Sequence, residues 1–264
     1  MKKLFIILIG LIFFASCGKN IITYGEVEYP DMSKAIVKIN MASMYPDNRF
    51  MFVKFNDVRV TPNIQGRQPY PGGGYNTYGD SRPDFLTADP GKLNVKVCMA
   101  SKRDPLKDSL LYEVNYDVQG GKSYTIHVAD TSQNTKSMLQ EEFFVMPDSG
   151  YASYKFVNLM PDVEFVDLYY GQSATSHVAD VLVASNIKFM TSSENFTLNR
   201  YMTRTWKVRK AGTGTTGTVL ASYVNAGAIL NQRQYTAYAL GYESSFGKTP
   251  ARTNRPFVSF FLVR

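Results

Sequence analysis

Two parts of this 264-residue chain carry the same short apolar segments in the same order, and this internal duplication limits the folds that the chain can adopt. In each part an apolar segment leads through Asn to a Pro-Asp pair, and further apolar segments follow. The matching pairs are residues 38–47 with 155–162, 50–56 with 165–171, 122–128 with 233–239, and 143–146 with 257–263. We therefore predict two related modules, residues 33–148 and residues 149–264, each of ordinary domain size.

The residue types in these segments indicate β-strands. Tyr, Phe, Val, Ile and Thr dominate them, and these side chains suit the pleated surface of a sheet. Residues 93–99 and 205–210 alternate apolar and polar side chains, which is typical of a strand with one buried face. No long stretch has helical spacing, and residues 135–142 are expected to form at most one short helical turn. We predict an all-β fold of two tandem antiparallel β-sandwiches, each closed by the last apolar segment of its module.

The second module also carries a series of motifs that resembles a known family. The motifs are Asn158, Pro161-Asp162, VDLYY at residues 166–170, a basic strand ending in Ala-Gly-Thr at 211–213, and YTAYALG at 235–241. Their order is similar to the family called domain of unknown function 4397, and the first module matches it more loosely through residues 88–92. The resemblance implies immunoglobulin-like sandwiches, often in tandem, on exported bacterial proteins. It implies no reaction and no ligand.

The N-terminus has the form of a bacterial lipoprotein signal. A basic start precedes an apolar run over residues 4–15, which is shorter than the roughly 20 residues of a membrane-spanning helix. Residues 14–17, Phe-Ala-Ser-Cys, resemble a lipobox, in which the Cys after two small residues is acylated, for example with palmitate. We predict a signal peptide over residues 1–16 and lipidation of Cys17, followed by a linker to residue 32. The alternative is an ordinary secretory signal with an incidental Cys.

The predicted lipid anchor makes a membrane the first expected partner of the chain. One acyl chain alone anchors weakly, so stable attachment requires several. The residues after Cys17 are Gly-Lys-Asn and lack the Asp that marks retention at the inner membrane in the enteric-type rule. We therefore predict an outer-membrane location and leave open whether the protein faces the periplasm or the cell surface.

The charge and the scarce residue types exclude several functions. Removing the two Lys residues of the signal peptide leaves 27 basic and 22 acidic residues, scattered along the chain, so no nucleic-acid partner is expected. Cys98 alternates within an apolar strand and is expected to be a buried, inert thiol. The two histidines, His127 on a predicted strand and His177 in a predicted loop, have no spaced partners. We therefore predict no metal site and no cofactor.

The remaining polar and aromatic candidates favour structural roles. Asp47 and Asp162 follow Pro at equivalent turns of the two modules, which favours turn formation over a catalytic pair of carboxylates. Trp206 is the only tryptophan in the sequence and alternates with Val208, so we expect it in the core. No Gly-x-Ser-x-Gly motif is present, and we identify no catalytic residue.

One long segment, residues 61–84, interrupts the first module. A loop of this length within a compact domain is either functional or disordered. It places tyrosines and polar residues on a Gly- and Pro-rich backbone, a composition that suits contact with a protein or a polysaccharide. The candidate ligand-binding residues are Arg67, Tyr70, Tyr75, Asn76, Tyr78 and Asp80. A solvated, poorly ordered loop is the competing interpretation, because three consecutive glycines oppose preorganisation.

These features predict a non-enzymatic, lipid-anchored protein of the cell envelope with a binding or structural role. One alternative is a glycan-binding surface lipoprotein that uses the segment of residues 61–84. A second alternative is a hydrolase whose site is dispersed between the modules, and it would require a polar cleft with a pair of acidic residues or a His near a Ser.

Overall fold

The computed structural model describes residues 31–45, 49–66, 68–70, 85–101, 108–199, 205–224, 231–247 and 254–263. The chain divides into two units, Met1–Asp31 and Met32–Arg264, and every described strand belongs to the second. Besides strands, the described residues form two 3-10 turns, Ser132–Asn134 and Glu243–Ser245, so the predicted all-β fold is confirmed. In this part of the chain no helix has the length and apolar character that crossing a membrane requires.

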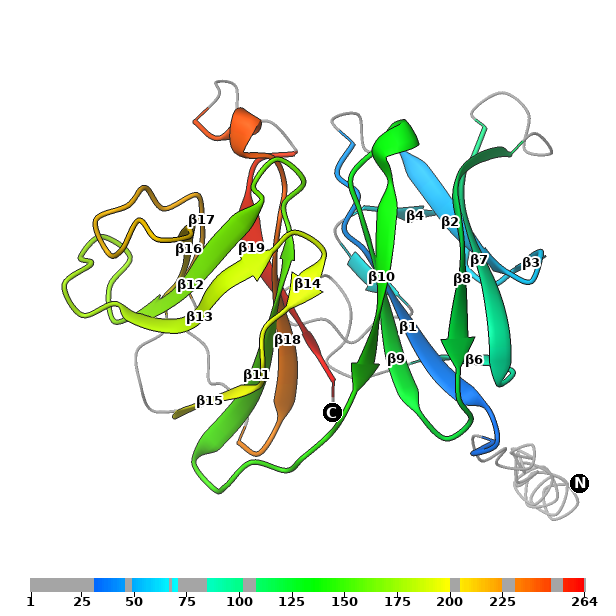
Figure 1. The fold of residues 1–264 in the computed structure, drawn as a ribbon, viewed down its shortest axis with the longest axis horizontal. Helices are drawn as coiled ribbons and strands as arrows, with labels where there is room; N and C mark the ends of the chain where they lie inside the picture. The colour runs from blue at the N-terminus through cyan, green and yellow to red at the C-terminus, as the bar shows by residue number, and fades with distance from the viewer. Residues whose placement is uncertain are drawn as a thin grey trace, which may run out of the picture. The chain divides into compact units, whose positions relative to one another are not determined.

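The first two sheets are built from strands between Ala35 and Glu142 (Figure 1). One has the strand order β10-β9-β1-β5, with β6 also paired to β1, and the other has the order β3-β2-β7-β8, with β4 also paired to β2. Their bounds are β1 Ala35–Met41, β2 Phe50–Phe55, β3 Val58–Arg59, β4 Ile64–Gln65, β5 Gln68–Tyr70, β6 Leu86–Ala88, β7 Gly91–Met99, β8 Ser109–Val118, β9 Ser123–Ala129 and β10 Lys136–Glu142.

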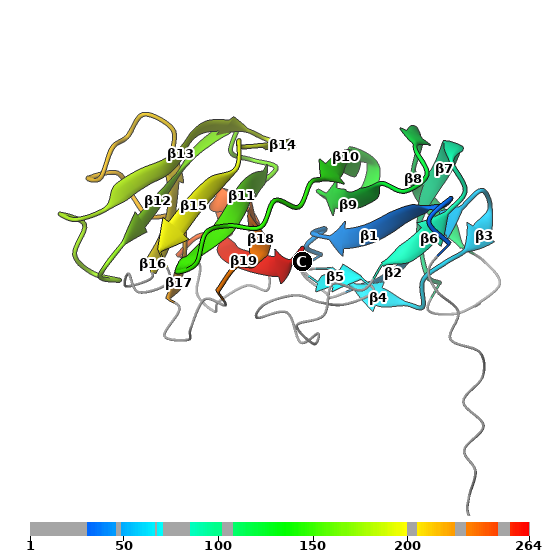
Figure 2. The same cartoon turned by 90° about the horizontal axis from the view of Figure 1, so that it is seen from below.

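The other two sheets are built from strands between Tyr151 and Leu262, as Figure 2 shows from a second direction. Their strand orders are β14-β11-β18-β19, with β15 also paired to β11, and β13-β12-β16-β17. Their bounds are β11 Tyr151–Leu159, β12 Phe165–Gly171, β13 Val181–Lys188, β14 Thr191–Ser192, β15 Phe196–Asn199, β16 Thr205–Lys210, β17 Ala221–Val224, β18 Gln234–Leu240 and β19 Phe257–Leu262.

The two halves repeat the same strand pairing. β1 runs parallel to β9, and β11 runs parallel to β18, whereas every other pairing between described strands is antiparallel. A parallel pair needs a long crossover connection, and the strands of the opposite sheet supply it in each half. The prediction of antiparallel sheets therefore holds except at this one pair in each half.

The closing strand of the first half is not the segment that its apolar residues suggested. Residues 143–146 form no strand, and Phe143, Val145 and Met146 are exposed. The last strand is β10, which pairs antiparallel with β9 just as β19 pairs with β18. The expectation of a helical turn over residues 135–142 is also wrong, because most of these residues belong to β10.

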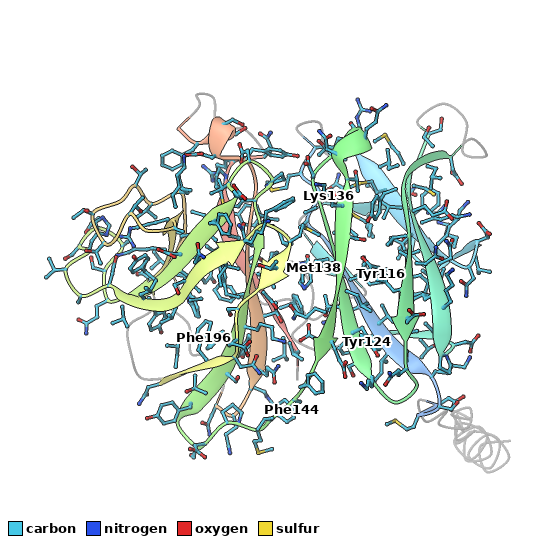
Figure 3. The ribbon with its side chains drawn as sticks, in the orientation of Figure 1. Tyr116, Tyr124, Lys136, Met138, Phe144 and Phe196 are labelled. Atoms are coloured by element: carbon cyan, nitrogen blue, oxygen red, sulfur yellow. The ribbon has the colours of Figure 1, made fainter. Side chains whose placement is uncertain are left out.

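Each half packs its two sheets around an apolar core. In the first half the core takes Val37, Met51, Val95 and Ile126 from the two facing sheets, among other residues. In the second half Trp206 is buried, as predicted, and its ring lies 4.8 Å from Tyr154, 4.9 Å from Tyr170 and 5.0 Å from Phe260, measured between centroids. Phe196 on β15 reaches the same aromatic group (Figure 3). Both halves are therefore β-sandwiches.

A third cluster of buried apolar residues lies outside both sandwich cores. Its buried members are Ala42, Met44, Ala129, Val157, Leu159, Tyr238, Leu240, Phe261 and Val263. Successive side chains of β11 point to opposite faces of its sheet. Phe156 lies in the core of the second sandwich, and Val157 lies in this third cluster. β1, β9, β11 and β18 are consequently covered on both faces, and polar residues on their outer faces are buried as well.

His127 on β9 is one of these buried polar residues. Its Nδ1 atom lies 3.0 Å from Asn40 Nδ2, and its ring centroid lies 6.0 Å from that of Phe261. Burial, together with the positive charge of Lys155, lowers the pKa of His127 to about 3. The imidazole is therefore neutral at neutral pH, which allows Nδ1 to accept a hydrogen bond from the Asn40 amide.

We expect protonation of His127 to destabilise the folded protein. Its pKa in the folded state lies below the ordinary value of 6.5, so the unfolded chain binds more protons as the pH falls. The free energy of unfolding should therefore decrease by up to about 1.4 kcal/mol per pH unit as the pH falls from about 6.5 to about 3. His127→Gln, which keeps an acceptor for Asn40, should reduce this slope in urea unfolding followed by Trp206 fluorescence. The control is His177→Gln, whose histidine side chain is 40% exposed, and an unchanged slope in His127→Gln would contradict the prediction.

Candidate functional site

Most of the predicted ligand-binding residues lie outside the described part of the chain. Arg67, Tyr75, Asn76, Tyr78 and Asp80 belong to this group, as do Cys17 and Asp47. Tyr70 is described through its backbone and ends β5, where it pairs with Ile39 of β1. The segment of residues 61–84 thus begins on strands β4 and β5.

The other predicted residues have structural surroundings. Cys98 is buried on β7, and burial raises the pKa of its thiol, which opposes a nucleophilic role. Asp162 lies in the predicted turn, and its carboxylate accepts hydrogen bonds from the backbone N–H groups of Glu243 and Ser244, at 2.8 and 2.9 Å. Among the described residues, no group of three His, Cys, Asp or Glu side chains could hold a metal ion.

The most concentrated polar site in the second sandwich is a charge cluster of Asp180, Lys207 and Arg209, which are buried, with the partly exposed His177 at its edge. Asp180 is 1% exposed, and its two oxygens lie 2.7 Å from Lys207 Nζ and 2.8 Å from Arg209 Nη2. Lys207 and Arg209 have no exposed side-chain surface, although both belong to the strand whose basic face was expected to meet solvent. That expectation for residues 205–210 is therefore wrong, because loops cover the face.

Two loops form this cover. Lys207 donates to the carbonyl oxygen of Ser176 at 2.8 Å, in the connection between β12 and β13, and lies 3.1 Å from His177 Nδ1. Arg209 Nε donates to the carbonyl oxygen of Gly217 at 3.0 Å, in the connection between β16 and β17. Burial opposes the charge of Asp180, but the hydrogen bonds from Lys207 and Arg209 outweigh it and hold the pKa of Asp180 below its ordinary value. The cluster therefore fixes both loops to the sheet.

Neighbouring side chains complete the cluster. The Arg209 guanidinium lies over the ring of Tyr169, 4.7 Å from its centroid, in a cation–π contact. Asp167, the cross-strand neighbour of Arg209, accepts hydrogen bonds from the backbone N–H groups of Asn186 and Gly212, at 2.7 and 2.9 Å. Arg209 Nη1 is buried and has no hydrogen-bond partner within the described residues.

The loop that Asp180 fixes carries exposed apolar side chains. Val178 is 96% exposed, and Val181 and Leu182 at the start of β13 are also exposed. A loop held by buried ion pairs loses little conformational entropy when it binds, so its exposed residues are suited to contact with a partner. The geometry thus supports recognition at the loop between β12 and β13.

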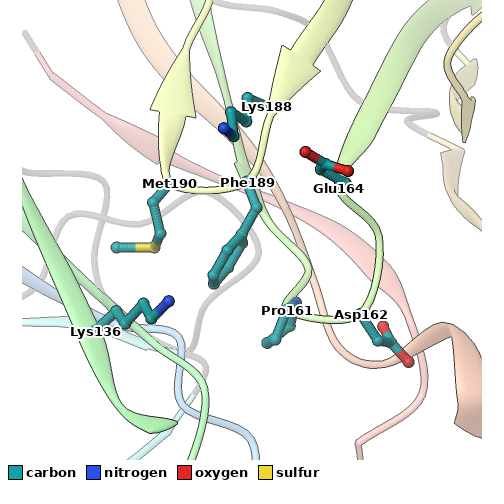
Figure 4. A pocket seen from close by; sticks show the side chains of 7 residues that line it. All are labelled: Lys136, Pro161, Asp162, Glu164, Lys188, Phe189 and Met190. Atoms are coloured by element: carbon teal, nitrogen blue, oxygen red, sulfur yellow. The ribbon is translucent and has the colours of Figure 1, made fainter.

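A shallow cavity of about 380 Å³ lies elsewhere on the same unit. Its lining residues are Lys136, Pro161, Asp162, Glu164, Lys188, Phe189 and Met190 (Figure 4). Figure 4 shows the Lys136 side chain extending toward Phe189 and Met190. Its charged side chains are of both signs and are exposed, so the lining does not select one class of ligand.

Comparisons with known proteins do not identify the chain. No family model matches the sequence, and no curated protein matches it. One similar solved structure is a leucine-rich repeat protein from Bacteroides thetaiotaomicron, with 12% identity, a TM-score of 0.18, and coverage of 77% of this chain but 25% of that one. Another is a candidate cell adhesion protein from Bacteroides uniformis, with 8% identity, a TM-score of 0.20, and coverage of 89% and 98%. At these TM-scores neither likeness supports an argument about function.

Gly171 offers a test of the charge cluster. A Cβ atom at Gly171 would collide with Asp180 Oδ1, the carboxylate oxygen that is paired with Lys207, while Arg209 holds Oδ2 of the same carboxylate. Gly171→Ala should therefore break the buried ion pairs and lower the free energy of unfolding by about 3–5 kcal/mol. In the Asp180→Ala background the same substitution should cost much less, because the colliding carboxylate is absent. Equal costs in the two backgrounds, measured by urea unfolding, would contradict this role of Asp180.

Proposed function

We propose that this protein is a lipid-anchored, non-enzymatic protein of the bacterial cell envelope that binds a partner through loops of its β-sandwiches. The observation that carries the binding role is the buried charge cluster. Asp180, Lys207 and Arg209 hold a loop whose Val178 is almost fully exposed. Exposed apolar residues on a rigid support are what a protein-binding surface requires.

Several contacts support a role other than catalysis. The polar side chains that sequence reasoning considered for chemistry are engaged in structural interactions, with Asp162 bound to backbone N–H groups and Cys98 and His127 buried at shifted pKa values. Asn158, a motif residue of the proposed family, donates from Nδ2 to the carbonyl oxygens of Val163 and Ile187, at 3.2 and 3.1 Å. These bonds support the proposal that the chain resembles domain of unknown function 4397 through residues that shape its fold.

The proposed anchor rests on the sequence of residues 14–17 and on the basic and apolar start that precedes it. Acylation of Cys17 would attach the chain to the outer membrane, with residues 17–32 as the linker to the first strand. Anchoring there would hold the sandwiches, and the loop that carries Val178, at the membrane surface.

Substitution of Cys17 tests the anchor. In cells fed a labelled fatty acid, Cys17→Ala should abolish labelling of the protein and move it from the membrane fraction to the soluble fraction, because the acylated sulfur is absent. Cys98→Ala is the matched control, since it removes the other cysteine and should leave labelling and fractionation unchanged. Continued labelling of the Cys17→Ala protein would refute the proposed site of attachment.

Photo-crosslinking tests the binding role. A photoreactive amino acid in place of Val178 should give one discrete adduct in intact cells, because the loop presents this position to solvent. Val58 on β3, 67% exposed, is the control position and should not give that adduct. The same adducts from both positions, or none from Val178, would argue against recognition by this loop.

A further inference from the structure

A row of polar side chains crosses three strands of the first sandwich. Lys38 of β1 pairs with Thr125 of β9, and Thr125 pairs with Gln140 of β10. All three point to the outer face of the sheet, the face that the third cluster covers, and they are buried. The side chains of Thr125 and Gln140 are direct cross-strand neighbours, so their Cβ atoms lie roughly 5 Å apart.

Glu142 contacts both members of this pair. It follows Gln140 by two residues on β10, and its Oε1 atom accepts a hydrogen bond from Gln140 Nε2 at 2.8 Å. The Thr125 hydroxyl lies close enough to the Glu142 carboxyl to lower its pKa, although the two groups do not meet the geometry of a hydrogen bond. Thr125 Oγ1, Gln140 Oε1 and Glu142 Oε2 are all buried, and none of them has a hydrogen-bond partner among the residues that the structure describes. Three such atoms in one place are costly for a folded protein and require an explanation.

The surroundings of Glu142 suit it to proton transfer. Burial raises the pKa of its carboxyl group, while Thr125, Lys155, Gln140 and Lys38 oppose this shift. A buried carboxylate with a raised pKa is a stronger base than an exposed one. The positive charges of Lys38 and Lys155 act on the same carboxyl group and favour its charged form, which is the form that accepts a proton.

We propose that Thr125 and Gln140 react within the folded protein to form an ester that links β9 covalently to β10. This inference does not depend on the function proposed above. It assigns a modification site to residues that fold and function alone leave unexplained.

The reaction needs no reagent beyond the chain itself. The Glu142 carboxylate accepts the Thr125 hydroxyl proton as Oγ1 attacks the amide carbon Cδ of Gln140. The Glu142 carboxyl then returns this proton to Gln140 Nε2, to which it is already hydrogen-bonded. The Cδ–Nε2 bond breaks, ammonia leaves, and the Oγ1–Cδ bond remains. No group is oxidised or reduced.

Burial and orientation favour this reaction and protect its product. Effective molarities of well-oriented neighbouring groups reach about 10⁵–10⁸ M, and here the sheet fixes both reacting side chains. The ester has no N–H or O–H donor, so its formation removes a buried hydroxyl for which the described part of the chain supplies no acceptor. The same covering layer that buries Thr125 and Gln140 keeps water from hydrolysing the ester.

Mass spectrometry of the full-length protein tests the proposal. Trypsin should release residues 123–136 and 137–155 as one branched species, lighter than the two separate peptides by one ammonia. Hydroxylamine, which cleaves esters, should separate them. Recovery of the two peptides from the native protein without a link, with Thr125 and Gln140 unmodified, would overturn the proposal.

Three variants define the chemistry of the link. Thr125→Val removes the nucleophile and Glu142→Gln removes the base, so both should yield separate peptides while circular dichroism shows a folded chain. Thr236→Val is the matched control, because Thr236 is also fully buried and occupies the corresponding position of β18 but pairs with Phe261. This control should keep the link. A linked species in Thr125→Val or Glu142→Gln would refute the assigned roles.

Discussion

The structure depends on a layer of buried side chains that covers the outer faces of β1, β9, β11 and β18. A sheet with one covered face can place its polar residues in water, but a sheet covered on both faces cannot. Lys38 therefore donates to the carbonyl oxygen of Leu262 at 3.3 Å, and its ammonium lies 5.0 Å from the ring centroid of Phe261. The neutral His127 and the close contacts of Glu142 follow from the same layer.

Sequence periodicity predicted the strands well and their surroundings less well. Residues 205–210 form a strand with the expected bounds, and the repeated segments 122–128 and 233–239 correspond to the parallel partners of β1 and β11. Alternation reveals which residues share a face, but it does not reveal whether a distant loop covers that face. Lys207 and Arg209 were thus expected in solvent. The sequence did not predict β10 as a strand, because the side chains on its outer face include the buried polar residues Gln140 and Glu142. The segment therefore has little apolar character.

The charge cluster lay beyond sequence reasoning for a related reason. Asp180 is 27 residues from Lys207 and 29 from Arg209, and no local motif connects them. One signal was available: two basic residues alternate with Trp206 and Val208 on a strand that is otherwise typical of a core. A cation in that setting requires a carboxylate from elsewhere. Gly171 offers a second signal in retrospect, since it leaves space for Asp180.

The parallel pairing of β1 with β9 has a mechanical consequence. Ile36 pairs with Ser123, and Ser123 pairs with Glu142, so the chain enters and leaves the first sandwich at the same end of one sheet. Tension applied between these two points would break the hydrogen-bonded rows of this sheet one after another, starting from that end. It would not load all of the hydrogen bonds between the strands at the same time. The row of Lys38, Thr125 and Gln140 is the third row from that end. The proposed bond between Thr125 and Gln140 would stop the separation of β9 from β10 at this row, and it would leave the pairing of β1 with β9 to break.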